Sequence, residues 1–465
     1  MTTFNIPESW LELNIGDIAD VIAGGTPKAA ELDNFAESGT AHAWLTPADL
    51  SKYNKKHISY GKRDLSQKGL DTSSAKLMPK GAILFSSRAP IGYVVVANNE
   101  ISTNQGFKSF VFTKHVDSSF AYYYLRSIRD VAESRGSGTT FKELSGANAK
   151  KLPFILAPLA EQIQIANKTD ELLAQVDIIK TRLDAIPAIL KRFRQSVLAA
   201  AVSGKLTEEW RTEQKNIKIE FESYTVSTDL PDSWRVVPLG DYVENLDNQR
   251  EPISTKEREQ RQGTFPYFGA SGQIDTIDGF THHGDFILIG EDGANLVTRT
   301  KPIAFSVTGK VWVNNHAHVL KCKPGYENTY LEHYINSIDL TPWVSGTAQP
   351  KLNQKNMNKI PIPVAPKDEQ TEIVKQVDRL LSFLDHIEQR VKEAQTRVNN
   401  LTQSILAKAF RGELTADWRE QNPDLISGEN SAEALLEKIK KEREAIEKAK
   451  PKKKKPKNST KKKCE

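Results

Sequence analysis

The amino-acid sequence predicts an α+β protein in which two pseudo-symmetric mixed α/β domains are joined by two long helices that form an antiparallel coiled coil. Three observations lead to this fold. Motifs of the first half of the chain recur in the second half, each half carries a long heptad pattern, and each half contains short β-like runs. At 465 residues, the chain is long enough for two to four domains.

The internal repeat sets the domain organisation. Motifs near the start of the two copies are 224 residues apart, whereas motifs later in each copy are 208 residues apart. The first globular segment is therefore 16 residues longer than the second, and the helical segments have equal length. The matched motifs are Pro7-Glu8-Ser9-Trp10 with Pro231-Asp232-Ser233-Trp234, Ser137-Gly138-Thr139 with Ser345-Gly346-Thr347, Glu161-Gln162 with Glu369-Gln370, and Gly204-Lys205-Leu206-Thr207 with Gly412-Glu413-Leu414-Thr415.

The heptad patterns predict two long helices, because apolar residues recur at alternating spacings of four and three. A helix over 163–201 would be roughly 58 Å long. An apolar stripe needs a partner, and two related copies can pair about a pseudo-two-fold axis, so we expect antiparallel helices with a domain at each end of a rod. Ordinary core helices are the alternative, which the unbroken heptads disfavour. The seam positions are Leu172, Val176, Ile179, Leu183, Ile186, Leu190, Phe193 and Val197 in the first copy, and Leu380, Leu384, Ile387, Val391, Ala394, Val398, Leu401 and Ile405 in the second.

One proline interrupts the first heptad pattern. Pro187 has no counterpart in the second copy, where Gln395 occupies the place. Proline removes a backbone donor and clashes with the preceding turn. We therefore expect a kink or a short break near Ala185 and Ile186.

The globular segments contain short runs of β-branched and aromatic residues bounded by turn residues, which predict strands of a curved mixed sheet. A short helix is expected just before each Ser-Gly-Thr motif. The expected strands cover 81–88, 93–97, 109–112, 285–290, 311–313 and 318–320, and the expected helices cover 119–134 and 329–338.

Polar residues in the loops between these strands carry the groups that DNA reading requires. Arg and Lys pair with guanine, Asn and Gln with adenine, and acidic groups with the cytosine amino group, while Lys and backbone amides hold phosphates. Any one of them is equally at home on a solvated surface loop, and the glycine-rich flanks are equally consistent with plain turns. The candidates are Thr26, Lys28, Thr46, Arg88, Asn104, Gln105, Lys108, Thr139 and Lys142 in the first copy, and Ser271, Glu291, Asp292, Asn314, Asn315, His316, Thr347, Gln349 and Lys351 in the second.

The basic charge is concentrated in the tail. The chain has a net charge of +5, but residues 451–465 hold eight Lys and one Glu, which is +7, so the remainder carries −2. A DNA-binding face on the folded body must therefore be a local patch. A helix is expected over 432–448, and the lysine run after it either contacts phosphates or aids solubility.

Motifs for catalysis are missing from the sequence. We find no phosphate-binding loop of the Gly-x-x-x-x-Gly-Lys-Ser/Thr kind, no Asn/Asp-Pro-Pro-aromatic tetrapeptide and no cofactor loop after a strand. The pairs His282-His283 and His316-x-His318 lack the spacing of a zinc site. No apolar run reaches about 18 residues, so no membrane span is indicated. The two cysteines, Cys322 and Cys464, form no disulfide framework and suit the cytoplasm. The sequence thus predicts a recognition and assembly scaffold.

Over about residues 5 to 420 the chain resembles the specificity subunits of type I restriction–modification enzymes. No single motif is decisive, but the order of the motifs and their duplication are specific. The motifs that carry the resemblance are Gly24-Gly25-Thr26-Pro27, Trp44-Leu45-Thr46-Pro47-Ala48-Asp49-Leu50, Phe85-Ser86-Ser87-Arg88-Ala89-Pro90-Ile91-Gly92, Ser102-Thr103-Asn104-Gln105-Gly106-Phe107-Lys108, Tyr267-Phe268-Gly269-Ala270-Ser271-Gly272, Val313-Asn314-Asn315-His316-Ala317-His318 and Pro158-Leu159-Ala160-Glu161-Gln162.

The resemblance implies two target-recognition domains, each reading one half of a bipartite site in double-stranded DNA. It also implies that the helical rod sets the spacer and binds two modification subunits, which use S-adenosylmethionine to methylate adenine. Separate restriction subunits would use ATP and magnesium to move and cleave DNA, so this chain would hold no cofactor. A stand-alone DNA-binding regulator or adaptor is the alternative, and a stand-alone enzyme is disfavoured by the missing motifs. The implied segments are recognition domains at 1–152 and 231–358, helical regions at 153–211 and 359–420, a linker at 212–230 and a tail at 421–465.

Overall fold

Each repeat in the computed structural model opens with a strand that pairs with the strand just before its long helix. Strand β1 (Leu11–Asn14) runs antiparallel to β11 (Pro153–Leu156), and β12 (Arg235–Pro238) runs antiparallel to β19 (Pro361–Val364). These pairs hold the two ends of each globular domain together. The structure describes residues 6–88, 90–138, 142–213, 230–346 and 348–449.

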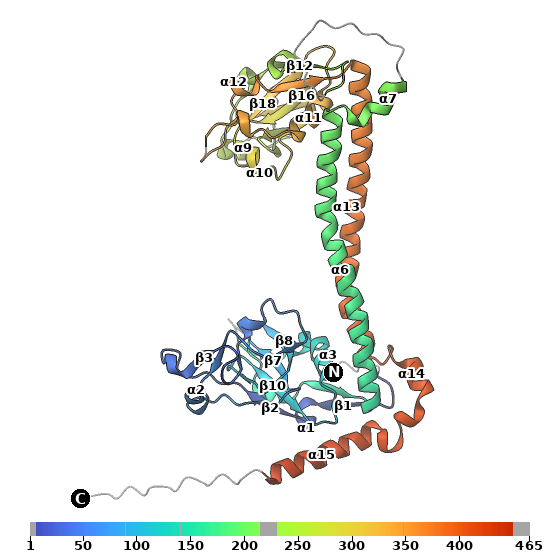
Figure 1. Ribbon diagram of the computed structural model, residues 1–465. Helices are drawn as coiled ribbons and strands as arrows, with labels where there is room; N and C mark the ends of the chain where they lie inside the picture. The colour runs from blue at the N-terminus through green and yellow to red at the C-terminus, as the bar shows by residue number, and fades with distance from the viewer. Residues whose placement is uncertain (1–5, 89, 139–141, 214–229, 347, 450–465) are drawn as a thin grey trace, which may run out of the picture. The chain divides into compact units, whose positions relative to one another are not determined.

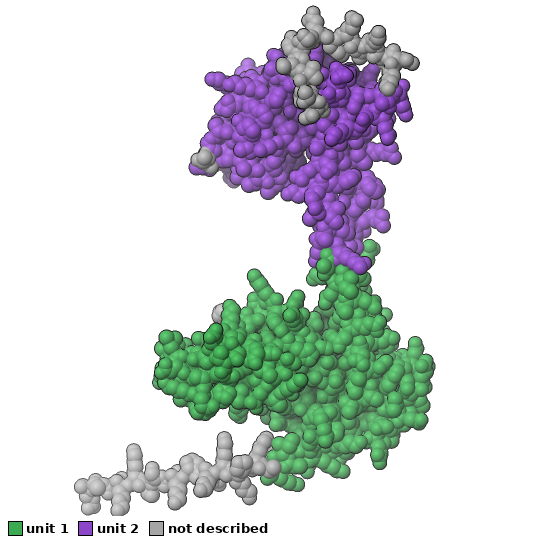
Figure 2. Space-filling model, in the orientation of Figure 1, with its two compact units in different colours: residues 1–181, 395–465 green, residues 182–394 purple. Residues whose placement is uncertain are grey.

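The chain divides into two units, which Figure 2 colours separately. The first unit comprises residues 1–181 and 395–465, and the second comprises residues 182–394. Each unit therefore contains one globular domain together with one part of each long helix.

The first domain is built on a five-stranded mixed sheet in the order β2-β10-β7-β8-β5. The central strand β7 (Ile83–Ser87) is buried along its whole length. Its alternate residues enter two different cores, since Phe85 packs with helix α3 and Leu84 packs with the cluster around Leu45 and Phe107. Burial on both faces explains the continuous apolar run that predicted this strand.

The predicted strands of the first domain are confirmed, whereas the helix predicted over 119–134 is divided at Ile128 into two helices. Its strands are β2 (Ala19–Ala23), β3 (Phe35–Glu37), β4 (Trp44–Leu45), β5 (His57–Ile58), β6 (Arg63–Leu65), β8 (Ile91–Ala97), β9 (Ser102–Thr103) and β10 (Lys108–Phe112). Its helices are α1 (Ile15–Ile18), α2 (Gln67–Asp71), α3 (Ser118–Ser127), α4 (Arg129–Ser134) and α5 (Gly146–Lys150), with 3-10 turns at Leu32–Asn34 and Pro47–Leu50.

The second domain repeats this plan with a six-stranded mixed sheet in the order β13-β18-β16-β17-β14-β15. The inner strand β16 again serves two cores, because Ile287 packs with helix α11 whereas Leu288 packs in a separate cluster. Its strands are β13 (Val243–Asn245), β14 (Phe265–Gly269), β15 (Gly272–Ile277), β16 (His282–Gly290), β17 (Ala304–Val313) and β18 (Ala317–Cys322). Its helices are α8 (Leu239–Tyr242), α9 (Thr255–Gln260), α10 (Asn295–Thr298), α11 (Asn328–Ser337) and α12 (Gln354–Met357), with 3-10 turns at Asp247–Gln249 and Thr341–Trp343.

Two helices of 44 residues each, α6 (Leu159–Val202) and α13 (Lys367–Phe410), follow the two domains (Figure 1). In the first unit, Ala166 of α6 shares a core with Ala409 of α13. In the second unit, the Arg194 guanidinium lies 3.1 Å from the Glu388 carboxylate. Within each unit the early part of one helix thus meets the late part of the other, so the helices pair antiparallel, as the heptads predicted. No helix among the described residues is long and apolar enough to cross a membrane.

The seam positions differ in how deeply they are buried. Val176, Leu190 and Val197 of α6 and Leu384, Val391 and Val398 of α13 are buried. In contrast, the Ile179, Phe193 and Leu401 side chains are 44%, 45% and 42% exposed. The remaining seam positions lie between these extremes. The helical pair alone therefore does not cover the whole apolar stripe.

The helix expected to break near residue 186 is continuous. Helix α6 passes through Pro187 without interruption, so the expected short break is wrong. The Pro187 side chain is exposed on the helix surface, where its ring meets solvent. The lost backbone hydrogen bond is a local cost that the paired helix tolerates.

A buried carboxylate explains several of the repeated motifs. In the first unit, Glu161 is fully buried and accepts hydrogen bonds from the Trp10 indole at 2.8 Å, the Thr415 hydroxyl at 2.8 Å and the Arg419 guanidinium at 2.9 Å. We call these four residues the first carboxylate junction.

A side chain at Gly412, whose φ is +77°, would collide with the ring of Pro7.

The second unit contains the matching junction. Glu369 accepts hydrogen bonds from the Trp234 indole at 3.0 Å, the Thr207 hydroxyl at 2.7 Å and the Arg211 guanidinium. Each junction takes its Trp and Glu from one repeat and its Thr and Arg from the other. The Thr and Arg motifs that follow each long helix therefore bind the buried carboxylate of the other repeat.

The tail beyond the repeat packs on the first domain. Helix α15 (Ala432–Ala449), which confirms the predicted tail helix, buries Leu435 and Ile439 in the core of the first unit. Its Arg443 donates to the backbone oxygens of Gly16 at 2.9 Å and Ala19 at 3.2 Å. The lysine run lies outside the described residues. The other elements here are α7 (Glu208–Glu213), α14 (Ala416–Gln421) and 3-10 turns at Lys205–Thr207, Pro423–Leu425 and Gly428–Asn430.

Candidate nucleic-acid interface

The inner strand of each sheet ends beside a tight turn that has the same hydrogen bonds in both domains. The Ser87 amide, at the end of β7, donates to the Gly106 oxygen at 2.7 Å, and the Glu291 amide, just after β16, donates to the His316 oxygen at 2.8 Å. The turn is closed by an asparagine side chain. The Asn104 carbonyl accepts from the Gly106 amide and the Asn314 carbonyl accepts from the His316 amide, both at 2.9 Å. Side-chain capping of this kind is typical of Asx turns.

A second shared feature is a backbone pairing between residues 137 and 143 and between residues 345 and 351. We call the described residues 137–138 and 142–143 of the first domain, and 345–346 and 348–351 of the second, the hook. In the second domain the Ser345 and Lys351 backbones exchange two hydrogen bonds of 2.8 Å, and Ser137 and Glu143 exchange two of 3.0 and 2.9 Å in the first. The residue after each hook donates to the end of the inner strand, from Leu144 to Ser87 at 2.9 Å and from Leu352 to Glu291 at 2.7 Å.

The strand end, turn and hook thus form one frame that both domains share. The exposed residue at the tip of the turn is Gln105 in the first domain and Asn315 in the second. Both carry an amide that can pair in a bidentate manner with adenine. The frame therefore presents an amide side chain at the tip of the turn in both domains.

In the first domain, a buried lysine ties the strand to the hook. Lys108 is 8% exposed, and its ammonium lies 3.3 Å from the Glu143 carboxylate and 3.4 Å from the Ser87 hydroxyl. The Arg88 guanidinium lies farther from the same carboxylate, at 4.0 Å, and remains partly exposed. Lys108 is thus occupied in holding the loops, whereas Arg88 has capacity for a further partner.

In the second domain, an acidic residue takes the place of Ser87. Glu291 accepts from Arg250 at 2.6 Å and pairs with Lys351 at 3.1 Å. Burial by itself raises the pKa of the Glu291 carboxyl, but the hydrogen bonds from Arg250 and Lys351 and the charge of His318 outweigh burial and hold this pKa below its ordinary value. The neighbouring Asp292 lies 2.9 Å from the His316 imidazole.

His318 occupies the place of Lys108 and ties its strand to Leu352, the residue after the hook. Its Nδ1 lies 2.5 Å from the Asp247 carboxylate and its Nε2 lies 2.7 Å from the Leu352 oxygen. Both partners can accept hydrogen bonds from the ring. A buried basic side chain at this position is common to the two frames.

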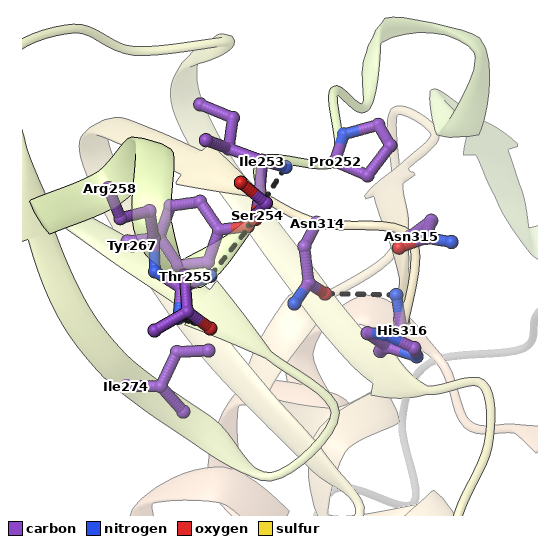
Figure 3. A pocket seen from close by; sticks show the side chains of 10 residues that line it. All are labelled: Pro252, Ile253, Ser254, Thr255, Arg258, Tyr267, Ile274, Asn314, Asn315 and His316. Atoms are coloured by element: carbon purple, nitrogen blue, oxygen red, sulfur yellow. Dashed lines mark hydrogen bonds between the residues drawn. The ribbon is translucent and has the colours of Figure 1, made fainter. Parts of the chain in front are cut away.

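A pocket of about 440 Å³ opens beside the second frame (Figure 3). Asn314 and His316 of the turn line one side, and the apolar side chains of Ile253 and Ile274 lie on the other. Arg258 lies over the Tyr267 ring at 4.7 Å from its centre. A pocket with amide, imidazole and aliphatic walls suits a base edge, because thymine methyl groups take apolar contacts and the other edges take hydrogen bonds.

The structure brings together most of the loop residues that the sequence nominated. Thr26 donates to the Gln105 side chain, and the exposed Lys142 and Gln349 lie on the two hooks. Lys28 instead pairs with Glu31 at 3.5 Å, and the Thr46 hydroxyl caps its own turn through Asp49. Thr139 and Thr347 lie outside the described residues. Ser271 lies in the tight turn between β14 and β15.

Sequence reasoning missed Arg250. This residue stands 224 positions after Thr26, so the early offset of the repeat already aligns the two. Its guanidinium bonds to Glu291 and to the Ala317 oxygen, where it completes the second frame. A residue-by-residue comparison of the two copies would have found it.

Among the residues that the structure describes, no group of three or more His, Cys, Asp or Glu side chains is placed to hold a metal ion.

The fold and the paired frames define a recognition protein with two related heads joined by paired helices. The family model described as the type I restriction modification DNA specificity domain matches residues 7–188 and 231–395. The specificity subunit of the type I restriction enzyme EcoKI from Escherichia coli K12 is 33% identical, over 96% of this chain and 98% of that protein. The EcoDI specificity subunit of Escherichia coli is 37% identical over 71% of this chain and 78% of that protein. The chain belongs to the family of type I restriction–modification specificity subunits.

Solved structures support the same fold. The HsdS subunit from Thermoanaerobacter tengcongensis has a TM-score of 0.60 at 18% identity, covering 89% of this chain and 99% of that chain. A chain from a study of complex assembly and conformational transition in a type I restriction–modification system also has a TM-score of 0.60, at 16% identity, covering 88% of this chain and 99% of that one.

Proposed function

We propose that the two domains read the two halves of a bipartite DNA site, one half each. The observation that carries this proposal is the frame that the domains share. The same backbone hydrogen bonds hold both loop clusters, while the presented side chains differ, with Arg88 and Gln105 in one domain and Asp292 and Asn315 in the other. A constant frame with different side chains suits two heads that read different bases.

We further propose that the paired helices set the spacer between the half-sites. An α-helix rises about 1.5 Å per residue, so one heptad inserted in both helices adds roughly 10 Å. That distance corresponds to about three base pairs along DNA, which rises about 3.4 Å per pair. The half-site sequences depend on the domains and should remain unchanged.

Exposed apolar side chains on the long helices support protein partners there. Ile178 and Ile179 in the first unit are 53% and 44% exposed, and Ile189 and Phe383 in the second are 52% and 61% exposed. Large apolar side chains that gather on a surface mark interaction sites. We propose that two methyltransferase subunits bind the helices and methylate adenine.

This proposal implies which subunit of the complex binds each cofactor. S-adenosylmethionine would bind to the methyltransferase subunits, while ATP and magnesium would bind to separate restriction subunits that cleave DNA. This chain would recognise DNA and assemble the complex without catalysing a step. This assignment places the protein in the cytoplasm, where the DNA and the partner subunits meet.

A map of methylated adenines in cells that carry this chain with its partner subunits tests the function. We expect a single bipartite motif with a fixed spacer. Replacing residues 231–358 by the equivalent segment of another specificity subunit should change one half-site and leave the other as it was. Methylation without a bipartite motif would contradict the proposal, and a change in both half-sites would contradict the independence of the domains.

A further inference from the structure

The shared frame allows the two domains to be compared residue by residue. Ser87 corresponds to Glu291, since each receives a hydrogen bond from the residue after the hook and donates to the turn. Arg88 therefore corresponds to Asp292. The backbone confirms this match, because Arg88 bridges to Glu143 and Asp292 bridges to Lys351 at the end of the hook.

Charges at these matched positions are opposite in sign. The strand-end position carries Arg88 in the first domain and Asp292 in the second, while the hook position carries Glu143 and then Lys351. The backbone hydrogen bonds are nevertheless the same in both domains. The fold thus accepts either sign at the strand end, so the sign is not determined by the fold.

Neither the Arg88 nor the Asp292 side chain has all of its hydrogen-bonding capacity taken by partners within its own domain. Glu143 is held more closely by Lys108, at 3.3 Å, than by Arg88, at 4.0 Å. Among the residues that the structure describes, the Asp292 carboxylate pairs with the His316 imidazole at 2.9 Å, and the Asp292 side chain is 19% exposed while that of His316 is 50% exposed. The exposed amides Gln105 and Asn315 each stand one residue before the turn oxygen that accepts from Ser87 or Glu291, the residue that precedes Arg88 or Asp292.

We propose that Arg88 and Asp292 set the identity of the base at corresponding positions of the two half-sites. Arg88 selects guanine, whose N7 and O6 accept from a guanidinium in the major groove. Asp292 selects a base that offers an amino group there, which is cytosine or adenine. Glu143 and His316 are positioning residues. The inference rests on the proposed function, in which each domain reads one half-site.

Two substitutions test the proposal in the complex with the methyltransferase subunits. Arg88→Gln and Asp292→Asn keep side chains of similar size and remove the charge. Bound sequences are selected from a DNA library in which both half-sites are randomised. We expect Arg88→Gln to reduce the preference for guanine at one position of the first half-site by about tenfold or more, with adenine gaining. Asp292→Asn should change one position of the second half-site only.

Matched substitutions of exposed residues serve as controls. Lys76→Gln in the first domain and Asp278→Asn in the second remove the same charges from exposed residues outside the strand end, turn and hook, and should leave both half-sites unchanged. Asp278, like Asp292, has a basic partner, the Arg261 guanidinium at 2.9 Å. Thermal unfolding of every variant reports whether the domain is folded. If Arg88→Gln destabilises the fold, Arg88→Lys provides the second test, because lysine keeps the charge but loses the bidentate pairing.

The outcomes separate this inference from the proposed function. A wild-type complex that selects no bipartite motif contradicts the proposed function itself. A wild-type motif that persists at every position in folded Arg88→Gln and Asp292→Asn variants overturns the inference and leaves the proposed function standing. A change of the same position in both half-sites by one substitution would also overturn it.

Discussion

Removing the carboxylate of Glu161 should destabilise the first carboxylate junction and with it the first unit. The side chain is fully buried, and it is the common acceptor for Trp10, Thr415 and Arg419. In a Glu161→Ala variant the Arg419 charge, which is 19% exposed, would lose its ion-pair partner. Breaking a buried pair by removing one partner costs about 3–5 kcal/mol. We expect the free energy of unfolding of the first unit to fall by that amount.

A conservative variant separates the charge from the hydrogen bonds. Glu161→Gln keeps one oxygen acceptor but turns an amide donor toward another donor. Its expected cost is about 1–3 kcal/mol, which is the range for one buried polar group left unsatisfied. Glu369→Ala is the matched change in the second unit, where the carboxylate is held by Trp234, Thr207 and Arg211.

Denaturant unfolding gives the energies, and hydrogen exchange followed by mass spectrometry gives the location. In Glu161→Ala, exchange should rise in the segment 412–421 and remain unchanged in 204–213, and Glu369→Ala should show the reverse. A loss below about 1 kcal/mol, with exchange in 412–421 unchanged, would show that the junction does not hold the repeats closed.

Three further predictions concern the tail helix α15, Pro187 in helix α6, and Glu291 in the frame of the second domain. Ile439→Ala should destabilise the first unit by about 2–5 kcal/mol, because Ile439 is fully buried, whereas Ile446→Ala on the same helix, where the side chain is 47% exposed, should have little effect in the same denaturant titration. Pro187→Ala should stabilise the paired helices by about 2–3 kcal/mol, since alanine restores a backbone donor inside α6, and an unchanged unfolding midpoint would contradict this. The pKa of Glu291 is lowered in the folded state, so its stabilising contribution is present above the ordinary glutamate value of 4.5 and is lost as the pH falls through the lowered pKa. Glu291→Gln should therefore flatten the acid side of the stability profile of the second unit, and a profile as steep as that of the wild type would show that other groups are responsible.

The periodic features of the chain could be predicted from the sequence. The heptad spacing, the two repeat offsets and the apolar runs of β7 and β16 are local patterns, and each follows from how a helix or a strand presents its side chains. The tail helix was also visible, because its apolar positions recur at helical spacing. The break at Pro187 was predicted wrongly, since local propensity says nothing of the neighbouring helix that supports α6.

The loop residues show where sequence reasoning reached its limit. Lys108 and Arg88 looked alike as basic residues in polar loops, yet Lys108 is buried against Glu143 while Arg88 remains partly exposed. The repeat offset aligns Arg250 with Thr26, but its partner Glu291 lies 41 positions away and only the structure shows that contact. Side-chain exposure depends on which loops meet, and the sequence does not state which loops meet.

The sequence by itself therefore determined the repeat, the helix pairing and the resemblance to specificity subunits, all of which rest on spacing and order along the chain. Only the tertiary structure decided that Glu161 closes on Thr415 and Arg419 of the other repeat, and that Arg88 and Asp292 share one place in a common frame. The physical reason is that spacing is a property of the chain alone. Burial, ion pairing and the match between two loop clusters arise from contacts between residues far apart in the sequence.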